Sequence, residues 1–364
     1  MTEHRILSFI AVGAICLLVL TTSCRELAPE TAPGQVEPQE EVAARDVPAP
    51  TQQVSEPERE SEPPEKKPTV RLALKFTPPD STRYRVITEA DRSVTWEGAQ
   101  ADKPAKFQGG HTGNKIEMTF TQRIQSVDDQ GNAVAEIEIE ALKYSANVRD
   151  NVVLDFHSAR EKDKDHPLAK LIGRSYTIQI SPAGQVLKVI DANEARAAVI
   201  GDASAQKTAS TLLSEATIQQ RHGIPALPPA EKSQLSSGDS WSSIDAFSFD
   251  MMGGKSYEKV YTLKEVKETE GRQYAIVEMN AVPTTEMAQE LHQEQPTNPF
   301  EKMFDTTETY TGQLQLNLTA GKVEKCLENL LIEWVIVDPT PKDKENPAAL
   351  KMTAMRLYHI EQVD

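Results

Sequence analysis

The sequence predicts a mainly β (α+β) fold: two similar antiparallel β-sheet or half-barrel units, joined by a helical connection and preceded by a disordered N-terminal tether. Three observations support this prediction. Apolar and polar residues alternate with period two after residue 69, glycine-containing turns separate the alternating stretches, and a run rich in proline and glutamate precedes them. Period-two alternation buries one face of a strand and leaves the other in water, which is typical of antiparallel sheet.

Residues 1–23 are predicted to be a lipoprotein signal peptide. Arg5 precedes an apolar run from Ile6 to Leu20, and small residues stand directly before Cys24. Weak positive charge, a short hydrophobic stretch and a small-residue cleavage site are typical of an export signal. The alternative is an uncleaved anchor, but a run of about 15 apolar residues is shorter than the roughly 20 that span a bilayer.

A cysteine directly after the cleavage site resembles the lipobox of bacterial lipoproteins. The match departs from the usual pattern at Thr21, where those motifs carry leucine. The resemblance implies that Cys24 is the mature N-terminus and carries acyl chains such as palmitate, which anchor the protein in a membrane. Arg25 stands where enteric inner-membrane lipoproteins favour aspartate, so the resemblance implies the outer membrane, facing the periplasm.

Residues 24–68 are predicted to be a disordered tether. From residue 25 to 68, nine prolines and eleven acidic residues accompany only five basic ones, with almost no large apolar side chains. Such a segment cannot bury enough apolar surface to offset the entropy lost on ordering. We therefore expect an extended spacer between the lipid anchor and the β body.

Two β units are predicted, over residues 69–191 and 238–364. Strand-like alternation includes Leu72-Leu74-Phe76 in the first unit. The order of turns is similar in the two units, because the turns at Gly131 and Gly184 are 53 residues apart and those at Gly271 and Gly321 are 50 apart. This similarity favours a duplicated unit, although two unrelated β-meanders would also give it.

The segment between the units, residues 192–237, is predicted to be helical. Apolar residues from Val199 to Ala216 recur at helical spacing, with a break at Gly201-Asp202 and an end near His222. A second short helix is expected over residues 285–292.

No sequence motif identifies a catalytic residue. Ser204 and Lys207 fit the S-x-x-K pattern of penicillin-binding proteins, but the S-D-N and K-T-G elements that accompany it there are missing. Residues 155–166 hold two histidines and four carboxylates, which could ligate a divalent metal. Their alternation with lysines favours a solvated mobile loop instead. Cys326 is expected to be a buried apolar side chain. We therefore predict no catalytic residue, no metal ligand and no cofactor.

The charge of the chain bears on its partners. The formal net charge is −16, and so acidic a surface repels the phosphates of nucleic acids and of anionic lipids. Nucleic acid is therefore not an expected partner.

Two short segments carry a resemblance to a known family. Residues 79–86 (PDSTRYRV) and 173–186 (GRSYTIQISPAGQV) resemble a family of uncharacterised bacterial, planctomycete-type exported lipoproteins. More loosely, a helix-covered antiparallel sheet behind a lipidated cysteine resembles half-barrel periplasmic lipoprotein carriers, which hold acyl chains in their concave face.

These resemblances imply a noncatalytic, membrane-anchored lipoprotein of the cell envelope. Its β body is expected to bind a hydrophobic ligand or an envelope protein partner. The alternatives are a structural or scaffolding surface protein and a hydrolase of unrecognised type.

Overall fold

The computed structural model describes residues 68–97, 109–249, 252–285, 303–337 and 347–364. The predicted signal peptide, Cys24 and nearly all of the predicted tether lie outside the described residues, as does most of the expected helix at 285–292.

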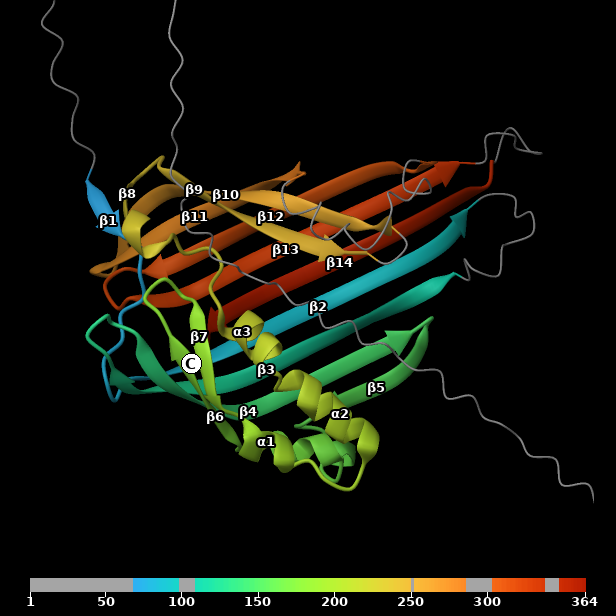
Figure 1. Ribbon diagram of the computed structural model, residues 1–364, viewed down its shortest axis with the longest axis horizontal. Coiled ribbons are helices and arrows are strands. Elements are labelled where there is room, and N and C mark those ends of the chain that lie inside the picture. Colours follow the sequence, from blue (N-terminus) through green and yellow to red (C-terminus); the bar gives the residue numbers. More distant parts are fainter. Residues whose placement is uncertain (1–67, 98–108, 250–251, 286–302, 338–346) are drawn as a thin grey trace, which may run out of the picture. The chain divides into compact units, whose positions relative to one another are not determined.

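The mainly β, antiparallel fold is confirmed. Twelve strands of the described part of the chain form one continuous sheet in the order β7-β6-β4-β3-β2-β14-β13-β12-β11-β10-β9, with β5 paired to β4 (Figure 1). The first half consists of β2 (Ser81–Glu97), β3 (Gly110–Val127), β4 (Ala133–Val148), β5 (Asn151–His157), β6 (Ser175–Ile180) and β7 (Val186–Asp191). The second half consists of β9 (Ser240–Ser248), β10 (Gly254–Thr269), β11 (Arg272–Thr284), β12 (Asp305–Asn317), β13 (Lys322–Val337) and β14 (Ala349–Gln362).

The two halves join through β2 and β14, which are neighbours in the middle of the sheet. Their register places Val86 opposite Ile360 and Thr88 opposite Tyr358. The predicted units therefore share one sheet, and its centre consists of strands from opposite ends of the described chain. Whether the two halves are duplicates of one another stays a prediction.

A short extended segment departs from the sequence prediction. The alternation of Leu72, Leu74 and Phe76 predicted a strand, but β1 is only Thr69–Arg71 and pairs with β8 (Gln234–Ser236) in a separate small sheet. The prediction was wrong because the backbone N–H groups that follow do not pair with a single strand. We call residues 72–77 the strap.

The strap is held by three separate loops. The N–H of Leu72 donates to the carbonyl of Ser233, that of Leu74 to Pro182, and that of Lys75 to Gly321. Gly321 itself is in the left-handed region, at φ +66°, and a Cβ there would lie 2.6 Å from the backbone nitrogen of Lys75. Glycine is therefore needed at this turn both for its backbone conformation and for its contact with the strap.

The predicted helical connection is confirmed in its main features. It contains α1 (Asn193–Ala197), α2 (Ala203–Leu212) and α3 (Glu215–His222), with a break at the predicted place. Asp202 caps α2 by accepting from the N–H of Ala205 at 2.6 Å, which supplies a partner that the first turn of a helix lacks. The connection also contains η4 (Ala230–Lys232) and β8.

The helices pack on the first half of the sheet, α3 against β7 and α1 against β6 (Figure 1). Their buried apolar side chains, such as Ala209 and Leu212, belong to the same core as the strands. Two 3-10 turns, η2 (Glu161–Asp163) and η3 (Pro167–Leu171), add Leu168 and Leu171 to that core. Among the described residues, no helix is long and apolar enough to cross a membrane.

Candidate functional site

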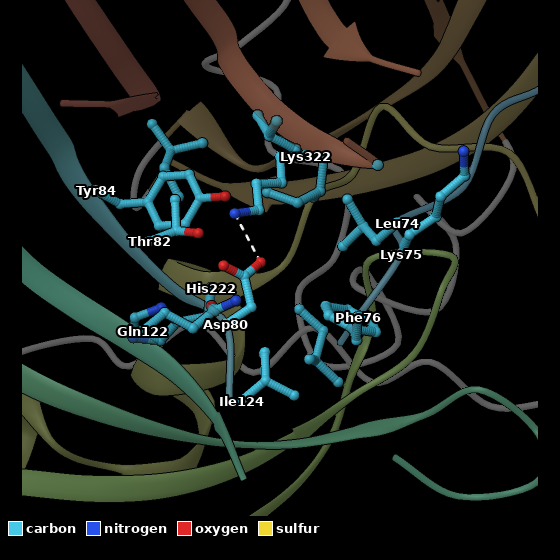
Figure 2. A pocket seen from close by; sticks show the side chains of 15 residues that line it. Leu74, Lys75, Phe76, Asp80, Thr82, Tyr84, Gln122, Ile124, His222 and Lys322 are labelled. Atoms are coloured by element: carbon cyan, nitrogen blue, oxygen red, sulfur yellow. Dashed lines mark ion pairs between the residues drawn. The ribbon is translucent and has the colours of Figure 1, made fainter. Parts of the chain in front are cut away.

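A small cavity lies where the two halves of the sheet meet, beneath the strap (Figure 2). Its volume is about 30 Å³, which is room for a water-sized group and far less than an acyl chain needs. We call it the junction cavity. Its apolar lining is contributed by both halves, the strap and the segment after α3: Leu74, Phe76, Ile124, Ile180, Ile224, Val323 and Ile360.

The strap closes this cavity with apolar and charged contacts. Leu74 and Phe76 line the cavity, and the Lys75 ammonium donates to the carbonyl of Leu318 at 2.6 Å. The Nζ of Lys322 and the Oδ2 of Asp80 form an ion pair of 2.7 Å, which Figure 2 marks by a dashed line. The cover of the cavity is thus an extended segment held by a few hydrogen bonds, not a helix or a paired strand.

Two aromatic groups in the cavity wall are unsuited to acid–base work at neutral pH. Burial raises the pKa of Tyr84, and the carboxylates of Glu324 and Asp80 raise it further. Burial, with the positive charge of Arg221, holds the pKa of His222 well below its usual range. Both side chains are therefore uncharged near pH 7.

A buried cation stands behind this wall. The Nε2 of His222 lies 2.7 Å from the hydroxyl oxygen of Tyr176, whose pKa burial raises and the nearby Arg221 guanidinium lowers in part. Arg221 is only 2% exposed and donates from Nη2 to the carbonyl of Leu212 at 2.8 Å. Its buried Nη1 has no hydrogen-bond acceptor among the described residues.

A second, polar hollow adjoins the junction cavity at the same end of the sheet. Its volume is about 290 Å³, and Lys322 lines both spaces. We call it the polar hollow. Its lining comes from the β10–β11 and β12–β13 turns and from neighbouring strand ends: Arg272, Asn317, Thr319, Ala320, Lys322, Glu324 and Gln362.

The second half of the sheet contains a buried ionic network that sequence reasoning missed. Lys259 on β10 is 1% exposed. Its Nζ lies 2.7 Å from Asp245 Oδ2 and 3.3 Å from Glu328 Oε2. Glu328 also accepts from the hydroxyls of Tyr261, at 2.8 Å, and Tyr310, at 2.9 Å. The network joins β9, β10, β12 and β13.

The amine and the phenols of this network keep their protons at neutral pH. Burial opposes the charge of Lys259, but Glu328 and Asp245 outweigh it and raise the pKa of the ammonium. Burial, reinforced by Glu328, also raises the pKa of Tyr261 and of Tyr310. A protonated amine and neutral phenols are neither nucleophiles nor general bases. The chemistry of this cluster is structural: it holds four strands together.

The charged residues of the segment 155–166, for which metal binding was the less favoured alternative, come together around an arginine. Arg160 donates from Nε to Asp163, at 2.6 Å, and from Nη1 to Asp155, at 2.8 Å. Asp163 also accepts from the backbone N–H of His157 at 2.9 Å and is 7% exposed. The charges of the segment thus pair locally and most of them are exposed, as expected for a solvated loop, whereas Asp163 is buried. No set of three or more possible metal ligands is found among the described residues.

The other residues considered from the sequence lie in three different places. Cys326 is fully buried, as predicted, and burial raises the pKa of its thiol. Ser204 and Lys207 lie exposed on α2, which gives neither the burial nor the charged neighbours that activate a nucleophile. Cys24 lies outside the described residues.

Comparison with known proteins gives a structural match and a family match to report. No curated protein matches the chain. A solved structure titled "Lipid-protein interactions in lipovitellin" matches at 10% identity and a TM-score of 0.35, covering 80% of this chain and 26% of that one. The chain thus spans about a quarter of that structure, and so low a TM-score does not establish a shared fold.

The second match is to a family model. It covers residues 130–323, more than half of the chain, and it is described as a family of unknown function. The chain therefore belongs to the DUF6263 family.

Proposed function

We propose that this protein is a noncatalytic lipoprotein of the cell envelope, anchored through Cys24, whose β body binds a single apolar chain at the junction cavity. The observation that supports it most directly is the strap. Over the junction cavity the core is covered by residues 72–77, whose apolar side chains occupy space that a ligand chain could take. The planctomycete-type family resemblance and the outer-membrane location belong to this proposal as well.

Binding requires the strap to move, because the closed cavity is too small for a chain. Displacing the strap breaks three backbone hydrogen bonds and the hydrogen bond from Lys75 to Leu318. Each of these contributes about 0.5–1.5 kcal/mol to stability. It also exposes Leu72, Leu74 and Phe76. A ligand replaces that apolar contact and gains about 0.8 kcal/mol for every methylene it buries. Exposing the three apolar side chains costs about 1.5–3 kcal/mol each, so a chain of roughly 8 to 19 methylenes offsets the whole loss by this measure.

The state of the titratable groups also favours binding over catalysis. At the junction cavity Tyr84 and His222 are uncharged near pH 7, and in the second half Lys259 is protonated. None of these groups is poised to exchange a proton with a substrate at that pH. None of these three groups therefore supports the hydrolase alternative.

A scaffolding role has one specific observation in its favour. β7 is an edge strand of the sheet, and Leu187 and Ile190 on it are each 46% exposed. An exposed edge with apolar side chains can pair with a strand of another protein. This alternative predicts binding of an envelope protein that does not depend on the junction cavity.

The test measures binding of cis-parinaric acid, a polyene fatty acid that becomes fluorescent in apolar sites, to the full chain. Ile124→Phe adds about the volume of a methylene to the cavity wall and fills most of the remaining space. Ile190→Phe makes the same exchange on the exposed β7 and is the matched control. We expect the wild type and Ile190→Phe to bind the probe equally and Ile124→Phe to bind it more weakly, with circular dichroism showing that all three are folded.

Two outcomes would overturn the proposal. One is a wild-type protein that gives no saturable fluorescence change. The other is a folded Ile124→Phe variant that binds as tightly as Ile190→Phe.

A further inference from the structure

The charges around the junction cavity and the polar hollow indicate which class of ligand would bind there. We propose that the ligand is an anionic amphiphile, with its chain in the junction cavity and its negatively charged head in the polar hollow. This inference rests on the proposed function, since it names the ligand class of the same site.

The two spaces are neighbours, because one residue lines both of them. Lys322 lines both, so a molecule that places its chain under the strap brings its head beside this ammonium. The hollow, about 290 Å³, is large enough for a small head group. It is also lined by polar side chains, among them Asn317 and Gln362.

The charge around these two spaces differs from that of the chain as a whole. The residues that line the two spaces include three cations, Lys75, Arg272 and Lys322, and two carboxylates, Asp80 and Glu324. The local balance is therefore positive on a chain whose net charge is −16. A positive opening on an acidic protein attracts anions to that place and repels them elsewhere.

Both carboxylates already have partners, whereas two of the three cations are not paired with a carboxylate. Asp80 is paired with Lys322, and Glu324 accepts from the Asn317 amide at 2.9 Å. Among the described residues, Arg272 forms no side-chain ion pair, and Lys75 donates only to a backbone carbonyl. A guanidinium can bind a carboxylate or phosphate with two parallel hydrogen bonds.

A buried charge behind the cavity wall adds to the same field. Arg221 has no carboxylate partner among the described residues, and it is buried beside Tyr176, which contacts the cavity-lining His222. A buried charge is screened far less than an exposed one. Its positive potential therefore reaches the cavity and favours an anion over a neutral or cationic ligand.

The experiment compares cis-parinaric acid with its methyl ester on the full chain at pH 7.5. The acid is ionised and the ester is neutral, while their chains are identical. We expect the acid to bind about fivefold more tightly, with a preference that shrinks as salt is raised. The ester should show little dependence on salt.

Arg272→Gln removes the guanidinium without leaving a carboxylate unpaired. Lys322→Gln is less suitable, because it would leave Asp80 without its partner. We expect Arg272→Gln to weaken binding of the acid by about threefold and to leave the ester unchanged. Lys264→Gln, on the same β10–β11 hairpin but outside the hollow, is the matched control and should alter neither.

The outcomes separate this inference from the proposed function. If neither probe binds, the proposed function fails. If acid and ester bind equally tightly to the wild type, or if Arg272→Gln and Lys264→Gln act alike, apolar binding stands and the anionic head group is refuted.

Discussion

Replacing Lys259 by methionine tests whether the buried ionic network holds the second half of the sheet together. Methionine keeps much of the length of the side chain but removes the cation that Asp245 and Glu328 share. Removing one partner of a buried ion pair costs about 3–5 kcal/mol, because the remaining charge is left in a poorly solvated place.

The structure places this variant at the lower end of that range. Glu328 keeps the hydroxyl donors of Tyr261 and Tyr310. The side chain of Asp245 is 29% exposed, so water can replace the lost ammonium there. We therefore expect Lys259→Met to lower the free energy of unfolding by about 3 kcal/mol.

The assay is urea unfolding, followed by tryptophan fluorescence, because Trp241 stacks on Tyr261 at a ring separation of 5.7 Å. Lys264→Met on the same strand is the control, since Lys264 forms a half-exposed pair with Glu278 at 3.3 Å. Exposed pairs contribute about 0.2–1 kcal/mol. If the two variants lose the same stability, the buried network does not stabilise the sheet in the way argued here.

The same pair of variants has a pH signature. The folded state raises the pKa of Lys259 above its ordinary 10.5. Its contribution to stability is therefore complete below that pH and is lost as the pH rises through the folded-state value. The wild type should lose part of its advantage over Lys259→Met in strongly alkaline solution, where Lys264→Met shows no matching change.

Three further predictions concern other parts of the chain. Gly321→Ala should speed proteolysis within the strap, since its Cβ would clash with Lys75, whereas Gly271→Ala, with nothing within 4 Å, should cost only the left-handed backbone penalty of about 1–2 kcal/mol. The pKa of His222 is lowered on folding, so its stabilising effect is complete above about pH 6.5. Below that pH the free energy of unfolding should fall by about 1.4 kcal/mol per pH unit, and His222→Asn should flatten this part of the profile in calorimetry. Cys24→Ser should abolish palmitate labelling and leave an unprocessed precursor, and normal labelling would exclude the lipobox.

The helical connection could be predicted in detail because its signals are local. The break at Gly201-Asp202 coincides with an N-cap, and the segment after it has apolar residues at helical spacing. The turns at Gly131 and Gly321 could be predicted for the same reason, since both glycines have positive φ. Each of these features depends on residues only a few positions apart.

The strap and the continuous sheet could not be predicted, because they depend on distant partners. Leu72, Leu74 and Phe76 alternate as a strand does, and an extended segment that inserts alternate side chains into a core gives the same pattern. The pairing of β2 with β14 joins residues about 260 positions apart, such as Ser93 and Thr353. Nothing in the local sequence fixes that choice of partner.

The ionic network left a signal that was not used. Lys259 lies between Tyr257 and Tyr261 on the inward-facing positions of its strand, and Glu328 lies between the buried Cys326 and Leu330. A charged residue at the inward position of an alternating strand requires a partner. Two such residues of opposite charge in strands of one sheet would have allowed the pair to be predicted. The additional partners, two tyrosines and one aspartate, could not have been predicted in this way.

The region that the family model matches contains only part of the candidate site. The matched region, residues 130–323, contains the two sides of the sheet but not its central strands β2, β3 and β14, nor β13 beyond Val323. His222, Ile224 and Lys322 lie within it, as does Arg272, whereas the strap lies outside. Two of the three cations and part of the apolar wall thus lie in the matched region, whereas the strap with Lys75 does not. We infer that the strap, which must be displaced to open the cavity, sets when, or whether, a chain can enter.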